Sequence, residues 1–579
     1  MREETGTFKT FDNQELFYRT WEHDVKANGK ILLLLHRGHE HSQRLSSIAE
    51  REEFAGYKIF SYDNRGHGHT KVKPAYEFME LVRDLNAFVS FVCEKEGKTP
   101  EDIFIVANSV AGVVASTWVH DYAPNIKGMA LIAPAFRIKL YFPFAKEFLK
   151  LAIQFKPKLN IKSYVKSKFL THDINEQVLY DQDKLITPDI PANQLTTLLD
   201  TGIRIVDDAH LIAVPTLVLS AGDDYVVDSD IQGDFYANLS SPLKKFVKFD
   251  GFYHAIIHEL ENQKAIDEIS DFIQKCFKLK STKTKNKIII DEMINDTQKE
   301  HDKIAYGSLP MCTKLNYLVQ RKMMHTFGHM SNGMSVGLEY GFDSGVTLDY
   351  VYKNEPNGKN GFGKMMDKNY LNSIGWRGIR QRKINLIDSI KTKISSLQAD
   401  GKKVKILDIA GGPARYLIEI ADEYRDVEIQ VRDYQTQNVE EGRELAKKRN
   451  LDNITYKQSD AFNPANYDKE DYEPNIVIIS GVFELFSDNG LIQNAIDGVC
   501  SIMSDESFLI YTGQPWHPQL EQIANVLGNH QDEKWVMRRR SQYELDSIFS
   551  ASGFVKEKMK IDNWGIFTVS TALYTGKDV

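Results

Sequence analysis

Three side chains that lie far apart in the chain have the types and the order that nucleophilic catalysis by a serine requires. Ser109, Asp224 and His254 each follow an apolar run that suits a buried strand. A serine hydroxyl is a weak nucleophile at neutral pH, so it needs a histidine as base and a carboxylate that orients the histidine. We therefore predict a catalytic triad of these residues, with Asp223 and Asp228 as competing candidates for the acid.

The same chemistry needs two backbone N–H groups that point at the developing oxyanion. Val110, next to the serine, and Gly38, in the loop after the run ILLLLH, are suitably placed. Ala107 and Ala111 lie two residues either side of the serine, where glycine is favoured because strand and helix nearly touch in such a turn. Each extra methyl group costs about 1 kcal/mol by analogy with other overpacked sites, so we expect the turn to form.

A second group of residues suits a nucleotide-like ligand. The segment KVKILDIAGG (403–412) has the pattern of a strand and a glycine-rich turn, whose bare backbone lets a ligand approach closely. The next strand ends in an aspartate about 20 residues further on, the spacing expected for a ribose contact. The strand after that ends where an adenine amino group would lie. The predicted binding residues are Asp408, Gly411, Gly412, Asp433, Asp460 and Ala461.

The elements that must position these two groups are strands alternating with helices, in two separate runs. Such alternation indicates parallel sheets with helices on both faces. The lysine-rich stretch KCFKLKSTKTKNK (275–287) lies between the runs and is typical of a linker, with an exposed helix end as the alternative. We predict an α/β chain with one sheet in 1–278, a lid at about 137–205, a linker at 279–300, a mostly helical part at 301–400 and a second sheet in 401–579.

The first run resembles the monoacylglycerol lipase and lysophospholipase branch of the α/β-hydrolases, of the serine aminopeptidase S33 type. HRGHEHSQRL (36–45) is similar to the oxyanion loop of that branch, H-G-x-x-E-H-S, except that Arg37 replaces a glycine. YDNRGHGHT (62–70), FLTHDINEQVLYDQDKL (169–185) and AGDDYVVD (221–228) match in the same order. The resemblance covers about residues 5–275 and implies an α/β-hydrolase fold with a helical lid. It implies the same triad and oxyanion donors, and histidines that order a loop rather than bind a metal.

The second run resembles the class I methyltransferases, with a Rossmann-like fold and S-adenosylmethionine as cofactor. NIVIISGVFELF (475–486) is similar to their fourth strand, and Glu484 at its end is a candidate base on the side of the methyl acceptor. A nicotinamide dinucleotide domain is the alternative, but D-x-A-G-G-P fits its fingerprint poorly. Residues 337–383 resemble a bacterial methyltransferase family found fused to α/β-hydrolases. There Tyr350, Trp376 and Arg377 could close over the ligands, or could belong to a helical cap packed for stability.

One segment of the predicted lid is amphipathic. FPFAKEFLKLAIQFKPK (142–158) places Phe144, Phe148, Leu151 and Phe155 on one helical face and lysines on another. This apolar face could enter a lipid headgroup region or could pack on the catalytic body, and both interpretations stay open.

Composition favours a cytoplasmic protein. The formal net charge of −8 over 579 residues argues against a nucleic-acid binder. The four cysteines are far apart, which suits a reducing compartment. The first residues lack the pattern of a signal sequence, and the longest aliphatic run is too short to span a bilayer. Any contact with the inner membrane face would then come from the lid.

We therefore predict a bifunctional enzyme. One half hydrolyses a lipid-like or acylglycerol-like carboxylic ester, and the other is an S-adenosylmethionine-dependent methyltransferase with an unidentified acceptor. The alternative is that only one half is catalytic. In that case the hydrolase half, with its altered serine turn, would be a lipid-binding or regulatory module.

Overall fold

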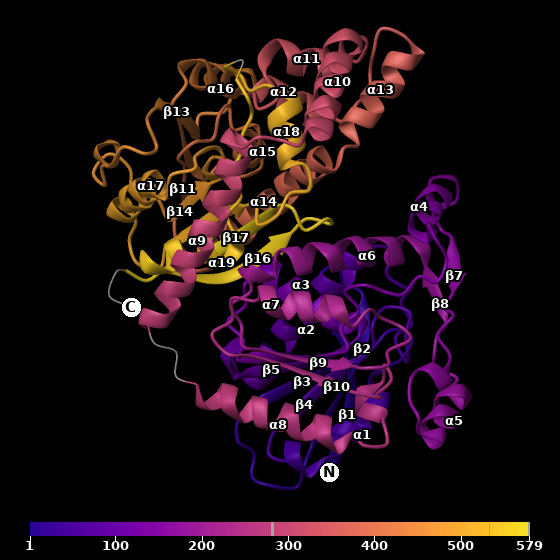
Figure 1. Ribbon diagram of the computed structural model, residues 1–579. Coiled ribbons are helices and arrows are strands. Elements are labelled where there is room, and N and C mark those ends of the chain that lie inside the picture. The colour runs from indigo at the N-terminus through magenta and orange to yellow at the C-terminus, as the bar shows by residue number, and fades with distance from the viewer. Residues whose placement is uncertain (280–282, 532, 577–579) are drawn as a thin grey trace. The chain divides into compact units, whose positions relative to one another are not determined.

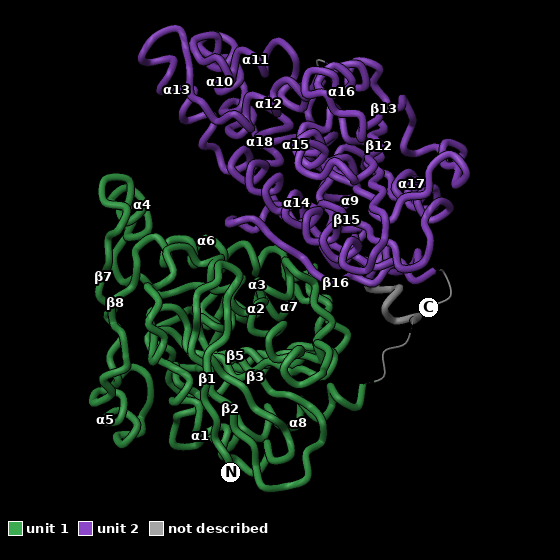
Figure 2. Tube along the Cα trace, turned by 180° about the vertical axis from the view of Figure 1, so that it is seen from behind, with its two compact units in different colours: residues 1–289 green, residues 290–579 purple. Residues whose placement is uncertain are grey.

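The chain forms two compact units, residues 1–289 and 290–579 (Figure 2). A computed structural model describes residues 1–279, 283–531 and 533–576. Each unit contains its own sheet, with helices on both faces (Figure 1). No helix within the described ranges is both long enough and apolar enough to cross a membrane.

The N-terminal unit is built on an eight-stranded sheet in the order β1-β2-β4-β3-β5-β6-β9-β10. Strands β1, β2 and β4 pair antiparallel, and the pairs from β4 to β10 are parallel. Every residue of β3 and β5 is buried, as expected for parallel strands covered on both faces. The strands are β1 Arg2–Lys9, β2 Glu15–Glu22, β3 Ile31–Leu35, β4 Lys58–Tyr62, β5 Ile103–Asn108, β6 Gly128–Ile132, β9 Thr216–Ala221 and β10 Lys244–Phe249.

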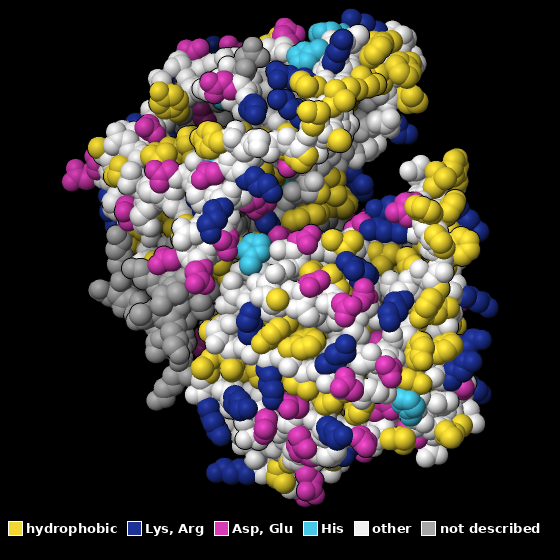
Figure 3. Space-filling model, viewed as in Figure 1, with side chains coloured by type: hydrophobic (Ala, Val, Ile, Leu, Met, Phe, Trp, Pro, Cys, Tyr) yellow, Lys and Arg dark blue, Asp and Glu magenta, His cyan; other side chains and the backbone are white. Residues whose placement is uncertain are grey.

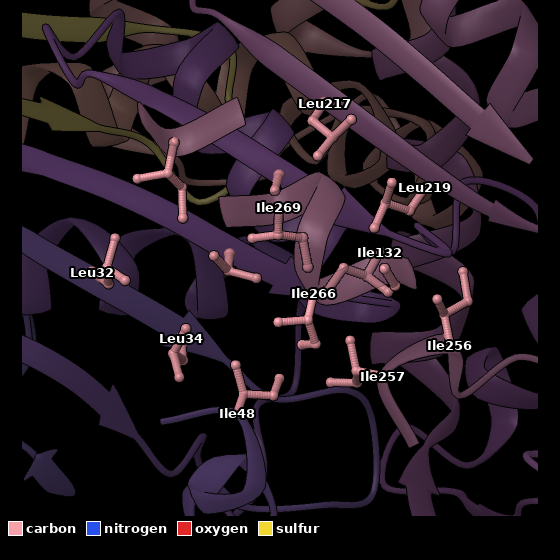
Figure 4. Close-up of a cluster of buried hydrophobic side chains, with 14 of the residues drawn as sticks. Leu32, Leu34, Ile48, Ile132, Leu217, Leu219, Ile256, Ile257, Ile266 and Ile269 are labelled. Atoms are coloured by element: carbon pink, nitrogen blue, oxygen red, sulfur yellow. The ribbon is translucent and has the colours of Figure 1, made fainter. Parts of the chain in front are cut away.

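One face of this sheet is covered by helix α8, whose apolar residues repeat at helical spacing. Ile266 and Ile269 lie in one buried cluster with Leu32 and Leu217 of the sheet (Figure 4), and Ile273 belongs to the same cluster. Helix α3, which follows the serine, contacts α2 and α6 and is buried along nearly its whole length. The helices around the sheet are α1 Ser46–Ala49, α2 Phe78–Glu96, α3 Val110–Tyr122, α6 Ala192–Asp207, α7 Asp230–Asn238 and α8 Gln263–Lys278.

The segment between β6 and α6 contains two helices and a two-stranded antiparallel sheet. Helix α4 (Ala145–Phe155) precedes strand β7 (Asn160–Lys162), and helix α5 (Ile174–Gln182) precedes strand β8 (Asp189–Pro191). Strands β7 and β8 pair antiparallel. We call residues 137–205 the lid segment.

The C-terminal unit is built on a seven-stranded sheet in the order β13-β12-β11-β14-β15-β17-β16. Its five strands from β13 to β15 are parallel, and β17 runs antiparallel to both of its neighbours. The chain order reverses between β11 and β14, and in such sheets ligands bind outside the carboxyl ends of the strands at this point. The strands are β11 Lys405–Asp408, β12 Glu428–Asp433, β13 Ile454–Gln458, β14 Ile476–Ile479, β15 Phe508–Gly513, β16 Phe554–Ile561 and β17 Thr568–Tyr574.

Helices precede this sheet and alternate with its strands. Helix α14 leads directly into β11 and buries Ile390 and Ile394 against the sheet core. The helices are α9 Lys283–Tyr306, α10 Met311–Phe327, α11 Asn332–Tyr340, α12 Gly345–Lys353, α13 Gly361–Leu371, α14 Ile374–Ala399, α15 Arg415–Glu423, α16 Thr436–Lys448, α17 Asn489–Ile502, α18 Leu520–Val526 and α19 Gln542–Ala551.

The predicted linker at 279–300 is wrong over most of its length, because helix α9 begins at Lys283. Met293 and Thr297 of this helix are buried in the C-terminal unit. The Thr297 hydroxyl donates to Glu544 at 2.9 Å and accepts from Arg538 at 3.0 Å. The lysine-rich start of the segment suggested a solvated chain, whereas its later residues carry a buried face. Positions 280–282 of the predicted linker lie outside the described residues.

Candidate active sites

Ser109 occupies a sharp turn between β5 and α3. Its backbone has φ +55° and ψ −114°, a conformation that non-glycine residues rarely adopt. Two hydrogen bonds hold the turn: the Ser109 N–H donates to the Ile132 carbonyl at 2.8 Å, and its carbonyl accepts from Ala135 N–H at 3.1 Å. The turn therefore presents the serine side chain at the carboxyl edge of the sheet.

The three predicted triad residues form one continuous hydrogen-bonded chain. His254 Nε2 lies 2.8 Å from Ser109 Oγ, and His254 Nδ1 lies 2.7 Å from Asp224 Oδ2. Ser109, Asp224 and His254 are 4%, 3% and 2% exposed, so solvent does not compete for these bonds. With Nδ1–H donating to the carboxylate, Nε2 is free to accept the serine proton.

The electrostatics of the site keep Asp224 ionised. Its second carboxylate oxygen accepts from the backbone N–H groups of Val226 at 2.7 Å and Val227 at 2.9 Å. Burial alone raises the pKa of Asp224, but His254 and these two N–H groups outweigh it, and the net pKa lies below its ordinary value. The competing Asp228 instead pairs with Arg137 at 3.3 Å.

The two predicted oxyanion donors come from residues that lie side by side. A Cβ atom at Gly38 would lie 3.2 Å from Val110 Cγ2. Both residues line the same cavity as Ser109 and His254. An oxyanion on a carbonyl attacked by Ser109 would therefore develop between the loop after β3, which carries Gly38, and the start of α3 at Val110.

Each departure from the family pattern is accommodated locally. Ala107 and Ala111 are buried, and the turn forms with both methyl groups present. Gly112 leaves little room for a side chain, because a Cβ atom there would lie 2.9 Å from Pro134 Cβ and one of the two would have to shift. The Arg37 guanidinium is buried and donates to Glu40 at 2.6 Å.

Glu40 carries the charge that balances this arginine. Burial raises the pKa of Glu40, but Arg37 and Arg44 outweigh that effect and lower it to about 2. The loop is also bound to the lid segment, because His39 Nδ1 lies 2.8 Å from the Thr187 carbonyl and His41 Nε2 lies 2.9 Å from Asp183.

A cavity of about 490 Å³ extends from the serine beneath the lid segment. Apolar side chains form most of its wall, and Ser109 and His254 are part of the lining. The lining includes Leu81, Phe142, Phe148, Leu149, Leu195 and Leu198.

Helix α4 exposes the apolar face predicted for the lid. Phe144, Phe148, Leu151 and Phe155 are 73%, 60%, 52% and 83% exposed, so the interpretation in which this face packs on the catalytic body is wrong. Apolar side chains gather over α4 on the surface (Figure 3). Its two lysines, Lys146 and Lys150, both pair with Asp200 on α6.

In the C-terminal unit, the predicted glycine-rich turn lies at the carboxyl end of β11. Gly411 has no room for a side chain, because a Cβ atom would lie 2.5 Å from Asp408 Oδ2. Gly412 has φ +59°, and its N–H donates to Asp433 Oδ2 at 2.8 Å. Asp433 Oδ1 accepts from Asn438 at 3.0 Å. The structure thus brings together the turn and the acidic residue that ends the next strand.

Asp460 and Ala461 follow β13, the strand beyond β12. The Asp460 carboxylate accepts from Phe462 N–H at 2.9 Å, and the Ala461 carbonyl accepts from the Tyr467 hydroxyl at 2.8 Å. These residues therefore lie at the same edge of the sheet as the glycine-rich turn, two strands away.

The residues predicted on the acceptor side divide into two groups. Trp376 packs in the core against Trp535, with ring centroids 6.2 Å apart, and the Tyr350 hydroxyl donates to the buried Asp367 at 2.6 Å. Arg377 lies over the Trp564 ring. These contacts favour the alternative of a packed helical cap. Glu484 is buried just after β14, and its role beside the acceptor stays a prediction.

Sequence reasoning missed several polar groups near this edge. The Tyr416 hydroxyl donates to Asp408, and burial lowers the pKa of His517, which follows β15, to about 4. Arg382 on α14 lies 3.5 Å from Glu484. Tyr416 lies in the first turn of α15, directly after the glycine-rich turn, and this position was the signal that could have identified it. Arg382 on α14 and His517 after β15 lie in segments that carry no motif.

Comparison with known proteins gives a family match for each half of the chain. Residues 26–261 match the family model "Serine aminopeptidase, S33", and the N-terminal unit is an α/β-hydrolase domain. Residues 269–574 match the model "Putative methyltransferase". The chain belongs to this methyltransferase family, in a form fused to the hydrolase.

Three relatives illustrate the two parts. "Uncharacterized protein YnbC" of Escherichia coli is 42% identical over 98% of this chain and 97% of its own length. "Phospholipase YtpA" of Bacillus subtilis is 25% identical, over 42% of this chain and 94% of its own. "Monoacylglycerol lipase" of Mycolicibacterium smegmatis is 23% identical, over 45% of this chain and 92% of its own length. The last two are similar to the hydrolase half alone.

The buried Asp408 should make the stability of the C-terminal unit depend on pH. Burial raises its pKa from 3.8 to about 7, so the folded chain keeps a proton that the unfolded chain has released. Stability should therefore fall as pH rises from about 4 to about 7, and Asp408→Asn should remove this part of the dependence. Thermal unfolding of both proteins across this range measures the difference, and parallel curves would contradict the assignment.

Proposed function

We propose that the N-terminal unit hydrolyses carboxylic esters through an acyl-enzyme. The observation that supports this most directly is the buried chain of hydrogen bonds from Ser109 through His254 to Asp224. Ser109 Oγ attacks the ester carbonyl carbon as His254 Nε2 takes its proton, and the N–H groups of Gly38 and Val110 donate to the oxyanion. His254 then returns the proton to the leaving alcohol.

The second half of the cycle uses the same groups. A water molecule attacks the acyl carbon while His254 Nε2 takes its proton, and the tetrahedral intermediate again lies against the two N–H donors. Collapse breaks the bond to Ser109 Oγ, which recovers its proton from His254. The products are a carboxylic acid and an alcohol.

The cavity supports a substrate with one long acyl chain. Its volume of about 490 Å³ and its apolar wall suit a single chain with a small head. We propose a monoacylglycerol-like or lysophospholipid-like ester, a class consistent with the names of the lipase and phospholipase relatives. The alternative, a lipid-binding module without catalysis, would not need His254 between two hydrogen-bond partners.

Ser109→Ala should lower ester hydrolysis by at least about 1000-fold, because the acyl-enzyme can no longer form. A fluorophosphonate probe should label the wild-type protein and leave this variant unlabelled. Ser90→Ala, at an exposed position on α2, is the matched control and should react like the wild type. A wild-type protein that takes up no probe would favour the non-catalytic module.

We also propose that the C-terminal unit transfers a methyl group from S-adenosylmethionine to an unidentified acceptor. The bare backbone at Gly411 and Gly412 leaves space for the ligand at the point where strand order reverses. Asp433 would accept from the ribose hydroxyls, with Asp460 and Ala461 near the adenine. When bound, this cofactor supplies a methyl group activated by a sulfonium, and the protein contributes chiefly by positioning donor and acceptor.

Asp433→Ala should weaken S-adenosylmethionine binding by about tenfold or more, because hydrogen bonds to a charged carboxylate are lost. Isothermal titration of the full-length protein measures this change. Asp452→Ala, an exposed aspartate just before β13, removes the same charge and should bind like the wild type. Equal binding by the Asp433 variant would show that the ribose contact lies elsewhere.

We further propose that the exposed face of α4 contacts a lipid surface, so that a cytoplasmic protein draws its ester substrate from the inner face of the membrane. The four exposed apolar side chains are continuous with the cavity wall, because Phe148 belongs to both. Lysines elsewhere in the lid segment, such as Lys156 and Lys158, are exposed and suit anionic headgroups.

Replacing Phe144 and Phe155 together by serine should abolish co-sedimentation with anionic phospholipid vesicles. Neither residue lines the cavity, so hydrolysis of a short water-soluble ester should persist. Leu260→Ser, at another exposed apolar position of the same unit, should leave vesicle binding unchanged. Undiminished binding by the double variant would argue against the contact.

A further inference from the structure

The Arg382 guanidinium in the C-terminal unit is largely buried yet uses none of its donors in a hydrogen bond. Its side chain is 11% exposed, and its Nη1 atom lies 3.5 Å from Oε1 of Glu484. It also lies over the Phe567 ring at 5.0 Å. No hydrogen bond from its five N–H groups is found among the described residues. The guanidinium nitrogens still reach solvent, so their donors are open to a ligand group.

Neighbouring arginines show what a satisfied guanidinium looks like in this unit. Arg540 donates to the carbonyls of Phe483 at 2.6 Å and Phe486 at 2.8 Å, and to Asn489 at 2.8 Å. Arg380, two residues before Arg382 on α14, donates to the Leu371 carbonyl at 2.9 Å. Arg382 differs from both because its donors remain available.

The position of Arg382 relative to the sheet is well defined. A Cβ atom at Gly481, just after β14, would lie 3.1 Å from Arg382 Nη2. The Gly481 N–H donates to the Thr512 hydroxyl at 2.9 Å, which fixes this backbone beside β15. The guanidinium therefore lies at the carboxyl end of β14, against a backbone that has no side chain there.

The order of the strands shows which part of the methyl donor would reach this place. In the proposed function, adenine lies at the end of β13, ribose at β12 and the glycine-rich turn at β11. Strand β14 comes next in the sheet, about 5 Å further along. A ligand that continues in the same direction brings its methionine portion to β14, and the charged group at that end is a carboxylate.

We propose that Arg382 binds the methionine carboxylate of S-adenosylmethionine, with Glu484 holding the guanidinium in place. The planar fork of an arginine matches the two oxygens of a carboxylate. This inference rests on the proposed methyltransferase function, to which it adds the recognition of the amino-acid end of the cofactor.

The test compares two ligands that differ at that end. Isothermal titration of the full-length protein measures affinity for S-adenosylmethionine and for 5′-methylthioadenosine, which lacks the carboxylate. Arg382→Gln should weaken binding of S-adenosylmethionine by about 10- to 100-fold and leave that of 5′-methylthioadenosine within about twofold. Arg382→Lys, which keeps the charge but loses the fork, should give an intermediate loss. Lys383→Gln removes a charge from the next residue, where Lys383 pairs with Glu419, and should change neither affinity.

The possible results separate this proposal from the one on which it rests. A selective loss for S-adenosylmethionine supports the carboxylate contact. Unchanged affinities, or equal losses for both ligands, overturn it while leaving the donor site itself intact. A wild-type protein that binds neither ligand refutes the proposed donor site and the Arg382 contact with it.

Discussion

The hydrogen bond between the Asp224 carboxylate and the His254 imidazole fixes the chemistry of the N-terminal unit. It joins residues that follow β9 and β10, and His254 then reaches across to the residue that follows β5. These loops meet only if the parallel strands keep their register, which depends on the apolar packing of α8 against the sheet. A displaced strand would separate base from nucleophile although every catalytic residue was still present.

The C-terminal unit places its glycine-rich turn at the corresponding edge of its own sheet, the carboxyl ends of the parallel strands. Its strand ends present little side-chain bulk at Gly411 and an acceptor at Asp433, so a flat ligand can lie on the backbone. The hydrolase edge instead presents a strained serine under an apolar cover. The carboxyl edges of the two sheets therefore differ: one carries a strained serine with a histidine partner, and the other carries a bare glycine turn beside an aspartate.

The sequence was informative where chemistry depends on strand ends. The order of Ser109, Asp224 and His254 predicted contacts that the structure contains, and the α/β fold of both halves followed from alternating apolar runs. It was less informative where contacts join distant elements. Helix α9 was mistaken for a linker because its lysines precede its buried face, and Arg382 lies on a helix without a motif. The environment of the lid face depended on tertiary packing, which helical periodicity alone does not determine.

Helix α9 bears on where the C-terminal unit begins. Its Thr297 fills a place between Arg538 and Glu544 near the C-terminus, so the methyltransferase fold begins more than a hundred residues before its first strand. Cutting the protein near residue 300 would leave the buried Arg538 without two of its acceptors, the Ile294 carbonyl and the Thr297 hydroxyl.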